Sequence, residues 1–195
     1  MQAYATCSLA SLIAKGKIFM IPAAFEYYRP TDMPDVLALL QKHGDDARVI
    51  AGGHSLIPMM KLRLAEVPHL IDLQDLAGLS DISVEDTITL GAMATQTDLI
   101  DHDALTAAAP IVREAALQIA DPQVRYMGTV GGNVANGDPG NDMPSLMQCL
   151  DAQFTVVGPD GERSIAAREF YEGAYMTARE DDEVLTSVSF VAPKG

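Results

Sequence analysis

Two short glycine-containing segments constrain this chain more than any other feature of its sequence: Ala51-Gly52-Gly53-His54-Ser55 and Thr129-Val130-Gly131-Gly132-Asn133. Each follows an extended stretch and offers consecutive backbone N–H groups beside glycines that carry no side chain, so an anionic group can approach the main chain closely. Hydrogen bonds to charged groups contribute about 1.5–3 kcal/mol each. Two such loops are therefore suited to holding a diphosphate.

The residues alone leave two interpretations of these segments open. A Gly-Gly pair also occurs in tight turns that bind nothing. Neither segment fits the Gly-x-Gly-x-x-Gly pattern of Rossmann folds or the Gly-x-x-x-x-Gly-Lys-Ser/Thr pattern of Walker loops. The segments therefore predict either a nucleotide-like ligand or two structural turns.

The charge of the chain excludes some classes of partner. There are 13 Lys and Arg against 27 Asp and Glu, which gives a formal net charge of −14. Phosphate backbones and anionic lipid surfaces repel a protein this acidic, so we expect no nucleic-acid or membrane-surface function. No apolar run approaches the ~20 residues of a transmembrane helix, so we expect no integral membrane segment.

Cysteine and histidine are too few and too scattered for a metal centre. The only cysteines are Cys7 and Cys149, and the four histidines lack the i, i+4 spacing of a helical metal pair. We therefore predict no metal site, reduced thiols and a cytoplasmic location.

Hydrophobic patterning predicts alternating strands and helices. In the first part we expect strands at 25–28, 48–50 and 70–73, a helix capped by Thr31 or Asp32 and ending at Gly44, and a helical turn at 59–63. In the second part we expect strands at 82–84, 87–90, 154–157, 162–165 and 184–190, and helices at 97–101, 111–120 and 145–150. The strand at 184–190 ends so close to the end of the chain that we expect an open sheet edge there, covered by a partner or by further chain.

These patterns predict three parts. Residues 1–19 are expected to be a non-native or disordered extension, because their positive charges follow the short apolar stretch and do not precede it as in a secretory signal. A small first lobe of βαβ type covers 20–78, and a second, larger lobe covers 79–195.

Three long motifs, at residues 51–63, 121–133 and 138–144, resemble in order those of the FAD-binding medium subunits of molybdenum hydroxylases. The carbon monoxide dehydrogenase branch of that family is the nearest form. Met20-Ile21-Pro22 is similar to the usual start of these subunits, and the resemblance covers about residues 20 to 195. It implies an α+β, two-lobed PCMH-type FAD-binding fold, with a small βαβ-type lobe and a larger lobe of mixed or antiparallel sheet.

The same resemblance implies which residues contact FAD. The first glycine segment, with Leu56, wraps the diphosphate from the first lobe, and the second segment does so from the second lobe. Asp142 corresponds to an acid that binds the adenosine portion, although it also suits a helix N-cap. Ile119 and Leu185 correspond to flavin-contacting positions, although both also suit the core. The cofactor-binding residues expected are Ala51, Gly52, Gly53, His54, Ser55, Leu56, Ile119, Thr129, Val130, Gly131, Gly132, Asn133, Asp142 and Leu185, with no catalytic residue.

The resemblance also implies a role in electron transfer. FAD is expected to bind without a covalent bond, and the molybdenum cofactor and [2Fe-2S] clusters are expected only in partner subunits. Those partners are an iron–sulfur small subunit and a molybdenum-binding large subunit of a hetero-oligomer, which would link the chain to the inner face of the membrane only through its partners. The expected function is to relay electrons from the iron–sulfur subunit through FAD to an external acceptor.

Two alternatives stay open. The family continues into a C-terminal domain that is absent from this sequence, so one alternative is a truncated, non-catalytic flavin-fold remnant or assembly module. The other is a stand-alone flavin oxidase with FAD covalently linked to His54, since histidine in a Gly-Gly-His-Ser loop is also typical of such proteins.

Overall fold

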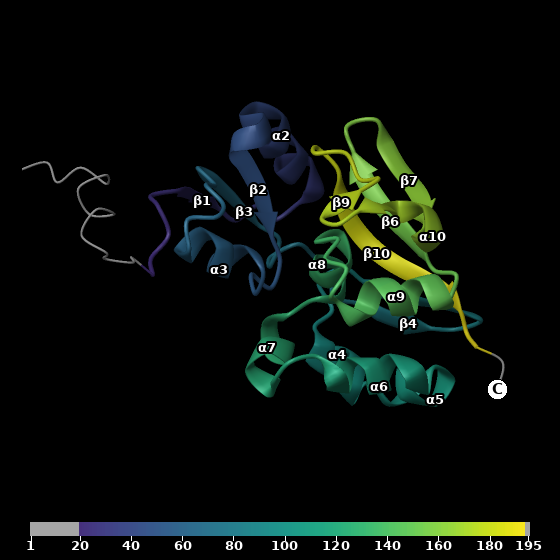
Figure 1. The fold of residues 1–195 in the computed structure, drawn as a ribbon. Coiled ribbons are helices and arrows are strands. Elements are labelled where there is room, and N and C mark those ends of the chain that lie inside the picture. The colour runs from purple at the N-terminus through teal and green to yellow at the C-terminus, as the bar shows by residue number, and fades with distance from the viewer. Residues whose placement is uncertain (1–19, 194–195) are drawn as a thin grey trace, which may run out of the picture.

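A computed structural model describes residues 20–193, which form an α+β fold built on two larger sheets and a small two-stranded one (Figure 1). The extension expected at residues 1–19 lies outside the described residues. One parallel sheet, one antiparallel sheet and the helices around them confirm the predicted fold class. Among the described residues, no helix is both long enough and apolar enough to cross a membrane.

The smaller sheet has three parallel strands in the order β1-β3-β2. The elements of this part are β1 (Glu26–Tyr28), α2 (Met33–His43), η1 (Gly44–Asp46), β2 (Ala47–Ile50), α3 (Leu56–Lys61) and β3 (His69–Asp72). Asp32 begins α2, because its side chain accepts a hydrogen bond from the backbone N–H of Asp35 at 3.0 Å. Val36 and Leu40, one helical turn apart, are the buried residues of α2.

The larger sheet is antiparallel, with its strands in the order β4-β5-β10-β6-β7. Its strands are β4 (Ile82–Val84), β5 (Thr87–Gly91), β6 (Gln153–Gly158), β7 (Gly161–Ala166) and β10 (Val184–Val191). The expectation of an open edge at the last strand is wrong. β10 lies at the centre of the sheet, between β5 and β6, because a strand's place depends on its partners and not on its order in the chain.

Short helices accompany this sheet. They are α4 (Gln96–Asp101), α5 (Asp103–Ala108), α6 (Pro110–Gln118), α7 (Pro122–Met127), α8 (Val130–Ala135), α9 (Asp142–Cys149) and α10 (Ala167–Phe170). Figure 1 shows α4, α6 and α5 in one row, while α8 lies between the two sheets. A small hairpin of β8 (Tyr171–Gly173) and β9 (Met176–Thr177) precedes β10.

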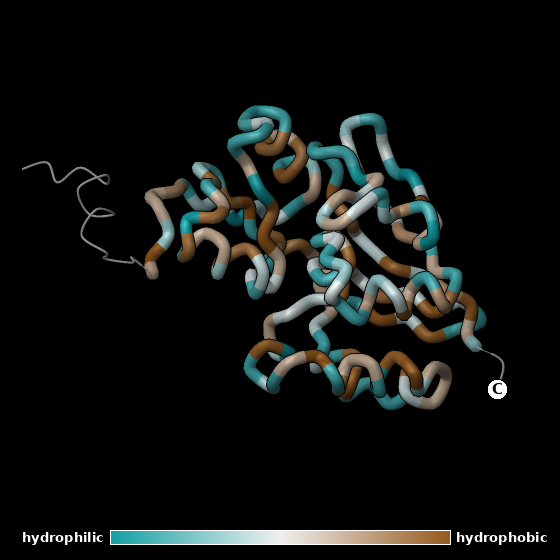
Figure 2. The backbone as a smooth tube through the Cα atoms, viewed as in Figure 1, coloured by the Kyte–Doolittle hydropathy of each residue, from teal (hydrophilic) through white to brown (hydrophobic). Residues whose placement is uncertain are grey.

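Two groups of buried residues hold these layers together. The larger lies between the antiparallel sheet and its helices and includes Phe154, Phe170 and Met147. The second joins the two sheets, because Val36 and Ile71 of the smaller sheet's layer share it with Met93, Val184 and other residues of the larger part. Figure 2 shows hydrophilic residues at the tip of the β6–β7 hairpin and on the outer turns of α2, away from these cores.

Every strand expected from the sequence is present, with bounds that differ by one residue at most. The helices differ more. α3 begins at residue 56 and α9 at residue 142, each three residues earlier than expected, and α5, α7, α8 and α10 were not expected as helices. α7 and α8 lie within the motif at 121–133, whose glycines led us to expect a loop.

Candidate functional site

The first glycine segment, residues 51–55, connects β2 to α3. Gly53 has φ 78°, in the left-handed region that favours glycine, and a Cβ there would lie 2.7 Å from Cδ1 of Ile57. Within residues 20–193, the backbone N–H groups of residues 52–55 have no hydrogen-bond acceptor. The segment therefore provides a run of available donors at the end of a strand.

Gly52 brings this segment against the second part of the chain. A Cβ on Gly52 would lie 1.9 Å from the carbonyl oxygen of Met127 and 3.0 Å from Cα of Gly128. Ala51 lies beside α8, since a Cβ added to Gly132 would be in ordinary contact with Cβ of Ala51, at 3.5 Å. The two glycine segments, about 80 residues apart in the sequence, therefore adjoin.

The second glycine segment is the beginning of a helix and not a loop. Thr129 is the N-cap of α8, and its Oγ1 accepts a hydrogen bond from the backbone N–H of Gly132 at 3.0 Å. Gly131 is required by packing, because a Cβ there would lie 2.5 Å from Cβ of Ala92 and 2.7 Å from its carbonyl oxygen. Glycine is unfavourable in a helix, and close tertiary contact overrides that preference here.

This geometry corrects one expectation about the second segment. The N–H groups of residues 130–133 are not available, because they already bond to the protein. Val130 donates to the carbonyl of Ala94 at 2.9 Å, Gly131 to that of Ala92 at 2.9 Å, and Asn133 to that of Thr129 at 3.0 Å. What the start of α8 does offer is the exposed surface of Gly132 and the side chain of Asn133. The buried Oδ1 of Asn133 has no hydrogen-bond partner within the described residues.

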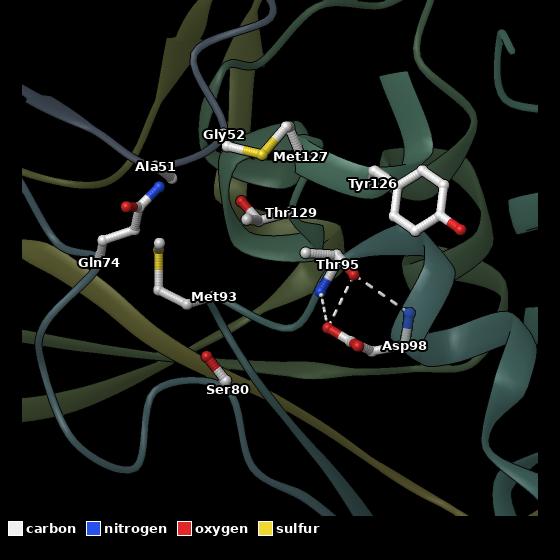
Figure 3. A pocket seen from close by; sticks show the side chains of 10 residues that line it. All are labelled: Ala51, Gly52, Gln74, Ser80, Met93, Thr95, Asp98, Tyr126, Met127 and Thr129. Carbon is white, nitrogen blue, oxygen red and sulfur yellow. Dashed lines mark hydrogen bonds between the residues drawn. The ribbon is translucent and has the colours of Figure 1, made fainter. Parts of the chain in front are cut away.

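A cavity of about 170 Å³ lies where the two parts of the chain meet (Figure 3). Its lining residues are Ala51, Gly52, Gln74, Ser80, Met93, Thr95, Asp98, Tyr126, Met127 and Thr129. Three of these, Ala51, Gly52 and Thr129, belong to the glycine segments. The other seven were not identified from the sequence.

Two of the seven residues form a pair that a known sequence pattern indicates. Thr95 and Asp98 form a capping box at the start of α4, with Oδ2 of Asp98 2.8 Å from the backbone nitrogen of Thr95 and 2.7 Å from its Oγ1. The spacing Thr-x-x-Asp is the usual signature of such a box. Of the remaining five, Tyr126 and Met127 are neighbours in α7 within the motif at 121–133, whereas Gln74, Ser80 and Met93 come from separate segments that no local pattern connects.

Asp142 lies next to Asn141, whose side chain forms a hydrogen bond with α8. It is the first residue of α9 and is exposed, and the N-cap of that helix is Asn141, so the alternative of Asp142 as N-cap is wrong. Nδ2 of Asn141 donates to the carbonyl oxygen of Asn133 at 3.2 Å. The structure therefore places the start of α9 beside the first turn of α8.

The remaining expected residues lie in or near the core. Val130 is fully buried and Leu185 is 5% exposed, in β10. Ile119 is half-buried at the end of α6, and its carbonyl oxygen accepts a hydrogen bond from Nη1 of Arg125 at 3.0 Å. Leu56 is half-buried against a small cluster around Met60. His54 and Ser55 are exposed beside the available N–H groups.

The described residues fit a diphosphate-containing cofactor, and nothing in them suits a metal. Within residues 20–193, the N–H groups of residues 52–55 have no acceptor and are free to donate, whereas the unpartnered buried Oδ1 of Asn133 is an acceptor and suits a donor group of a ligand. Among residues 20–193, no three His, Cys, Asp or Glu side chains gather closely enough to hold a metal ion. The donor set is therefore suited to phosphate oxygens.

Comparison with known proteins identifies relatives of nearly the whole described chain. Residues 23–192 match the family described as FAD binding domain in molybdopterin dehydrogenase. The carbon monoxide dehydrogenase medium chain of Afipia carboxidovorans is 57% identical over 175 residues, which are 89% of this chain and 61% of that protein. This chain thus spans about three-fifths of the length of the curated relatives it matches.

Solved structures agree with the sequence matches. The reconstituted CO dehydrogenase from Oligotropha carboxidovorans is similar with a TM-score of 0.88 and 56% identity, over 90% of this chain and 62% of that one. Quinoline 2-oxidoreductase from Pseudomonas putida 86 is similar with a TM-score of 0.86 and 35% identity, over 89% of this chain and 61% of that one.

Proposed function

Because this chain belongs to the family of FAD binding domains in molybdopterin dehydrogenases, we propose that it relays electrons through FAD within a molybdenum hydroxylase of the carbon monoxide dehydrogenase type. In this proposal, electrons come from an iron–sulfur small subunit and leave to an external acceptor. A large subunit with the molybdenum cofactor oxidises the substrate. The chain acts as part of the medium subunit of a cytoplasmic hetero-oligomer.

One observation carries the proposal: the N–H groups of residues 52–55 have no acceptor within residues 20–193, and Gly52 packs this segment against the residues that lead into α8. Four donors in one turn suit the oxygens of a diphosphate, and they can bind it even though the chain has a net charge of −14. Local donors determine anion binding at such short range, because more distant charges are screened by salt.

In this proposal, some of the other expected residues bind the cofactor and the rest shape the site by packing. Thr129, Gly132 and Asn133 complete the site from the second part, where Oδ1 of Asn133, which has no partner among the described residues, is available to accept a hydrogen bond from the cofactor. Asp142, exposed at the start of α9, binds the adenosine portion. Val130, Gly131 and Leu185 are buried and shape the site mainly by packing.

Bound FAD supplies the chemistry that links one-electron donors to one- or two-electron acceptors. The chain's own residues supply position. The glycine turn binds the phosphates, and the shared core under the two sheets keeps the two halves of the site in fixed relation. No general acid or base is required from this chain, because the substrate is oxidised in another subunit.

The proposal is tested by adding FAD to the purified chain, desalting it and recording the visible spectrum. Flavin bands that remain with the protein, and that leave it on denaturation, support non-covalent FAD. Flavin that stays with the denatured chain would indicate a covalent link at His54. A folded, colourless protein contradicts the proposal and favours the alternative of a non-catalytic flavin fold.

Ser55→Asp tests directly whether the N–H groups of residues 52–55 bind the phosphates of the cofactor. Ser55 is the N-cap of α3 and its side chain makes no capping hydrogen bond, so aspartate there should not destabilise the fold. Its carboxylate would occupy the donors and repel phosphate, and we expect FAD affinity to fall at least about tenfold. Ser83→Asp, exposed on β4, adds the same charge far from the donors and should leave affinity unchanged. Equal loss in both variants would refute a local anion site.

A further inference from the structure

α3 ends in a Schellman motif, in which two backbone hydrogen bonds close the last turn of a helix. The N–H of Leu64 donates to the carbonyl oxygen of Met59 at 2.9 Å. The N–H of Arg63 donates to the carbonyl oxygen of Met60 at 3.2 Å. The motif requires one residue in the left-handed region, where glycine is usual, and here that residue is Arg63, with φ 59°. A charged side chain therefore occupies a position that favours glycine.

Contacts within the described residues do not explain an arginine at this position. The left-handed conformation is unfavourable for any residue with a Cβ. Every other arginine in residues 20–193 donates at least one hydrogen bond from its side chain. Arg63 is half-buried, yet no hydrogen bond or ion pair within that range involves its guanidinium group. A strained residue with a partly desolvated, unpaired charge suits contact with another molecule.

Exposed apolar side chains lie on both sides of Arg63 in the sequence. Leu64 is 72% exposed, Leu62 is 50% exposed and Met59 is 38% exposed. The hydrogen bond between Leu64 and Met59 brings these two residues together at the end of the helix. Lys61 is exposed and adds a second positive charge, which has no ion pair among the described residues. We call Met59, Lys61, Leu62, Arg63 and Leu64 the α3 patch.

The composition of the α3 patch determines which kind of surface it fits. Arginine and methionine are enriched in protein interfaces, where an apolar centre is bordered by polar groups. The whole chain has a net charge of −14 and repels acidic surfaces in general, so two unpaired cations provide a local point at which an acidic surface can dock. The complementary partner is a protein face that presents carboxylates around apolar side chains.

The place of α3 in the fold indicates which partner that is. The helix begins directly after residues 52–55, whose N–H groups bind the phosphates of FAD in the proposed function, and it lies at the lower edge of the smaller part in Figure 1. Its six residues, at about 1.5 Å each, put the α3 patch roughly 10 Å from those donors. An electron donor must approach its acceptor closely, and electron-transfer interfaces are often small. A subunit on the α3 patch would lie beside the cofactor.

We propose that the α3 patch is the surface on which the iron–sulfur small subunit docks, and that Arg63 binds a carboxylate of that subunit. This inference rests on the proposed function, in which the small subunit delivers electrons to FAD. Arg63 contacts the partner and not the cofactor. Its replacement should therefore weaken docking and leave FAD binding unchanged.

Arg63→Gly tests the proposal, because it should change stability and docking in opposite directions. Glycine suits the left-handed region, so we expect the melting temperature to rise by about 1–2 °C. Loss of a hydrogen bond between charged groups should lower the affinity for the small subunit at least about tenfold. Lys42→Gln is the matched control, since Lys42 is an exposed cation on α2 without an ion pair in the described residues, and its loss should leave the affinity unchanged.

The affinity is measured by calorimetric titration of the full, FAD-loaded chain with a purified iron–sulfur small subunit of carbon monoxide dehydrogenase. Wild-type affinity should fall as the salt concentration rises, and the affinity of Arg63→Gly should fall less. Leu64→Ser removes an exposed apolar side chain and should also weaken docking, with little effect on the melting temperature. Visible spectra of the same samples report how much FAD each variant retains.

Equal affinity of the wild type and Arg63→Gly for the small subunit overturns the docking surface, as does a wild type that retains FAD but binds no small subunit. A matching loss of FAD affinity in Arg63→Gly would show that the cation acts on the cofactor, and overturns it too. Self-association of the chain that Leu64→Ser abolishes, seen by sedimentation velocity, would assign the α3 patch to a second copy instead. A wild type that binds no FAD overturns the proposed function, and the inference with it.

Discussion

The backbone of Gly52 packs directly against the backbone of Met127. A Cβ added to Gly52 would lie 1.9 Å from the carbonyl oxygen of Met127 and 2.6 Å from its carbonyl carbon. Because both atoms belong to the backbone, no change of side-chain rotamer relieves the contact. The approach determines how the donors at residues 52–55 lie against the start of α8, so the geometry of the proposed site depends on it.

Gly52→Ala should therefore destabilise the protein and damage the site together. We expect the free energy of unfolding to fall by about 2–3 kcal/mol, the upper range for an overpacked site, since the backbone must move. Urea denaturation followed by circular dichroism measures the change. Gly173→Ala is the matched control, because its Cβ would meet only Met176 at ordinary contact distances of 3.6 and 3.8 Å. Similar losses in both variants would contradict the close approach.

Much of this fold follows from local sequence patterns. The strands were predictable because apolar alternation and short turns such as Glu85-Asp86 are local signals. The donors beside Gly53 were predictable for the same reason, since a glycine turn after a buried strand needs no distant partner to be recognised.

The second half of the site could not be predicted in the same way. Gly131 indicates a loop when only the sequence is considered, because glycine lowers helix stability by about 1 kcal/mol relative to alanine. Glycine is required at residue 131 because Ala92, about 40 residues earlier in the chain, packs closely against it. The central place of β10 and the cavity lining at Gln74 and Tyr126 likewise depend on long-range contacts that no local pattern contains.

Glu183 should make stability depend on acid pH. The residue is 8% exposed, and its carboxylate accepts from Nε and Nη2 of Arg163 at 2.6 and 2.7 Å and from the N–H of Glu180 at 2.8 Å. The hydrogen bonds from Arg163 are the main reason that the pKa of Glu183 lies below its usual 4.5. The unfolded chain then binds more protons than the folded one, so this stabilisation is complete above pH 4.5 and is lost as the pH falls below it.

Glu183→Gln should remove that dependence and lower the free energy of unfolding at neutral pH by about 2 kcal/mol. Chemical denaturation at several pH values between about 3 and 7 measures both effects. Asp151→Asn serves as the control, since Asp151 and its partner Arg168 are both exposed and such pairs contribute about 0–1 kcal/mol. A variant at residue 183 with the wild type's acid dependence would refute this assignment.

A pair of stacked histidines should make stability depend on pH in a second range, below pH 6.5. The rings of His43 and His69 lie 3.7 Å apart between centroids, and Nε2 of His43 is buried without a partner among the described residues. Burial, and then the charge of His69 and Lys42, lowers the pKa of His43 from 6.5, against the smaller opposing effects of Glu26 and Asp46. The unfolded chain therefore takes up the proton first, and stability decreases as the pH falls below 6.5.

His43→Phe keeps an aromatic ring in the stack and removes the titrating group. The difference in unfolding free energy between about pH 7.5 and about pH 5.5 should be smaller in this variant than in the wild type. His54→Gln, an exposed position, should keep the wild-type difference. If His43→Phe shows the wild-type difference as well, the dependence has another origin.

Ala120 joins α6 to α7 in a conformation that alanine disfavours, with φ 43°. Arg125 holds this turn, because its Nη1 lies 3.0 Å from the carbonyl oxygen of Ile119 and 3.3 Å from that of Ala120. Ala120→Gly should relieve strain of about 1–2 kcal/mol and add flexibility to the unfolded chain, for a net stabilisation of about 0.5 kcal/mol. Thermal unfolding measures this gain. Ala107→Gly, exposed within α5, should instead destabilise by about 1 kcal/mol, and the same sign in both variants would show that the turn stores no strain.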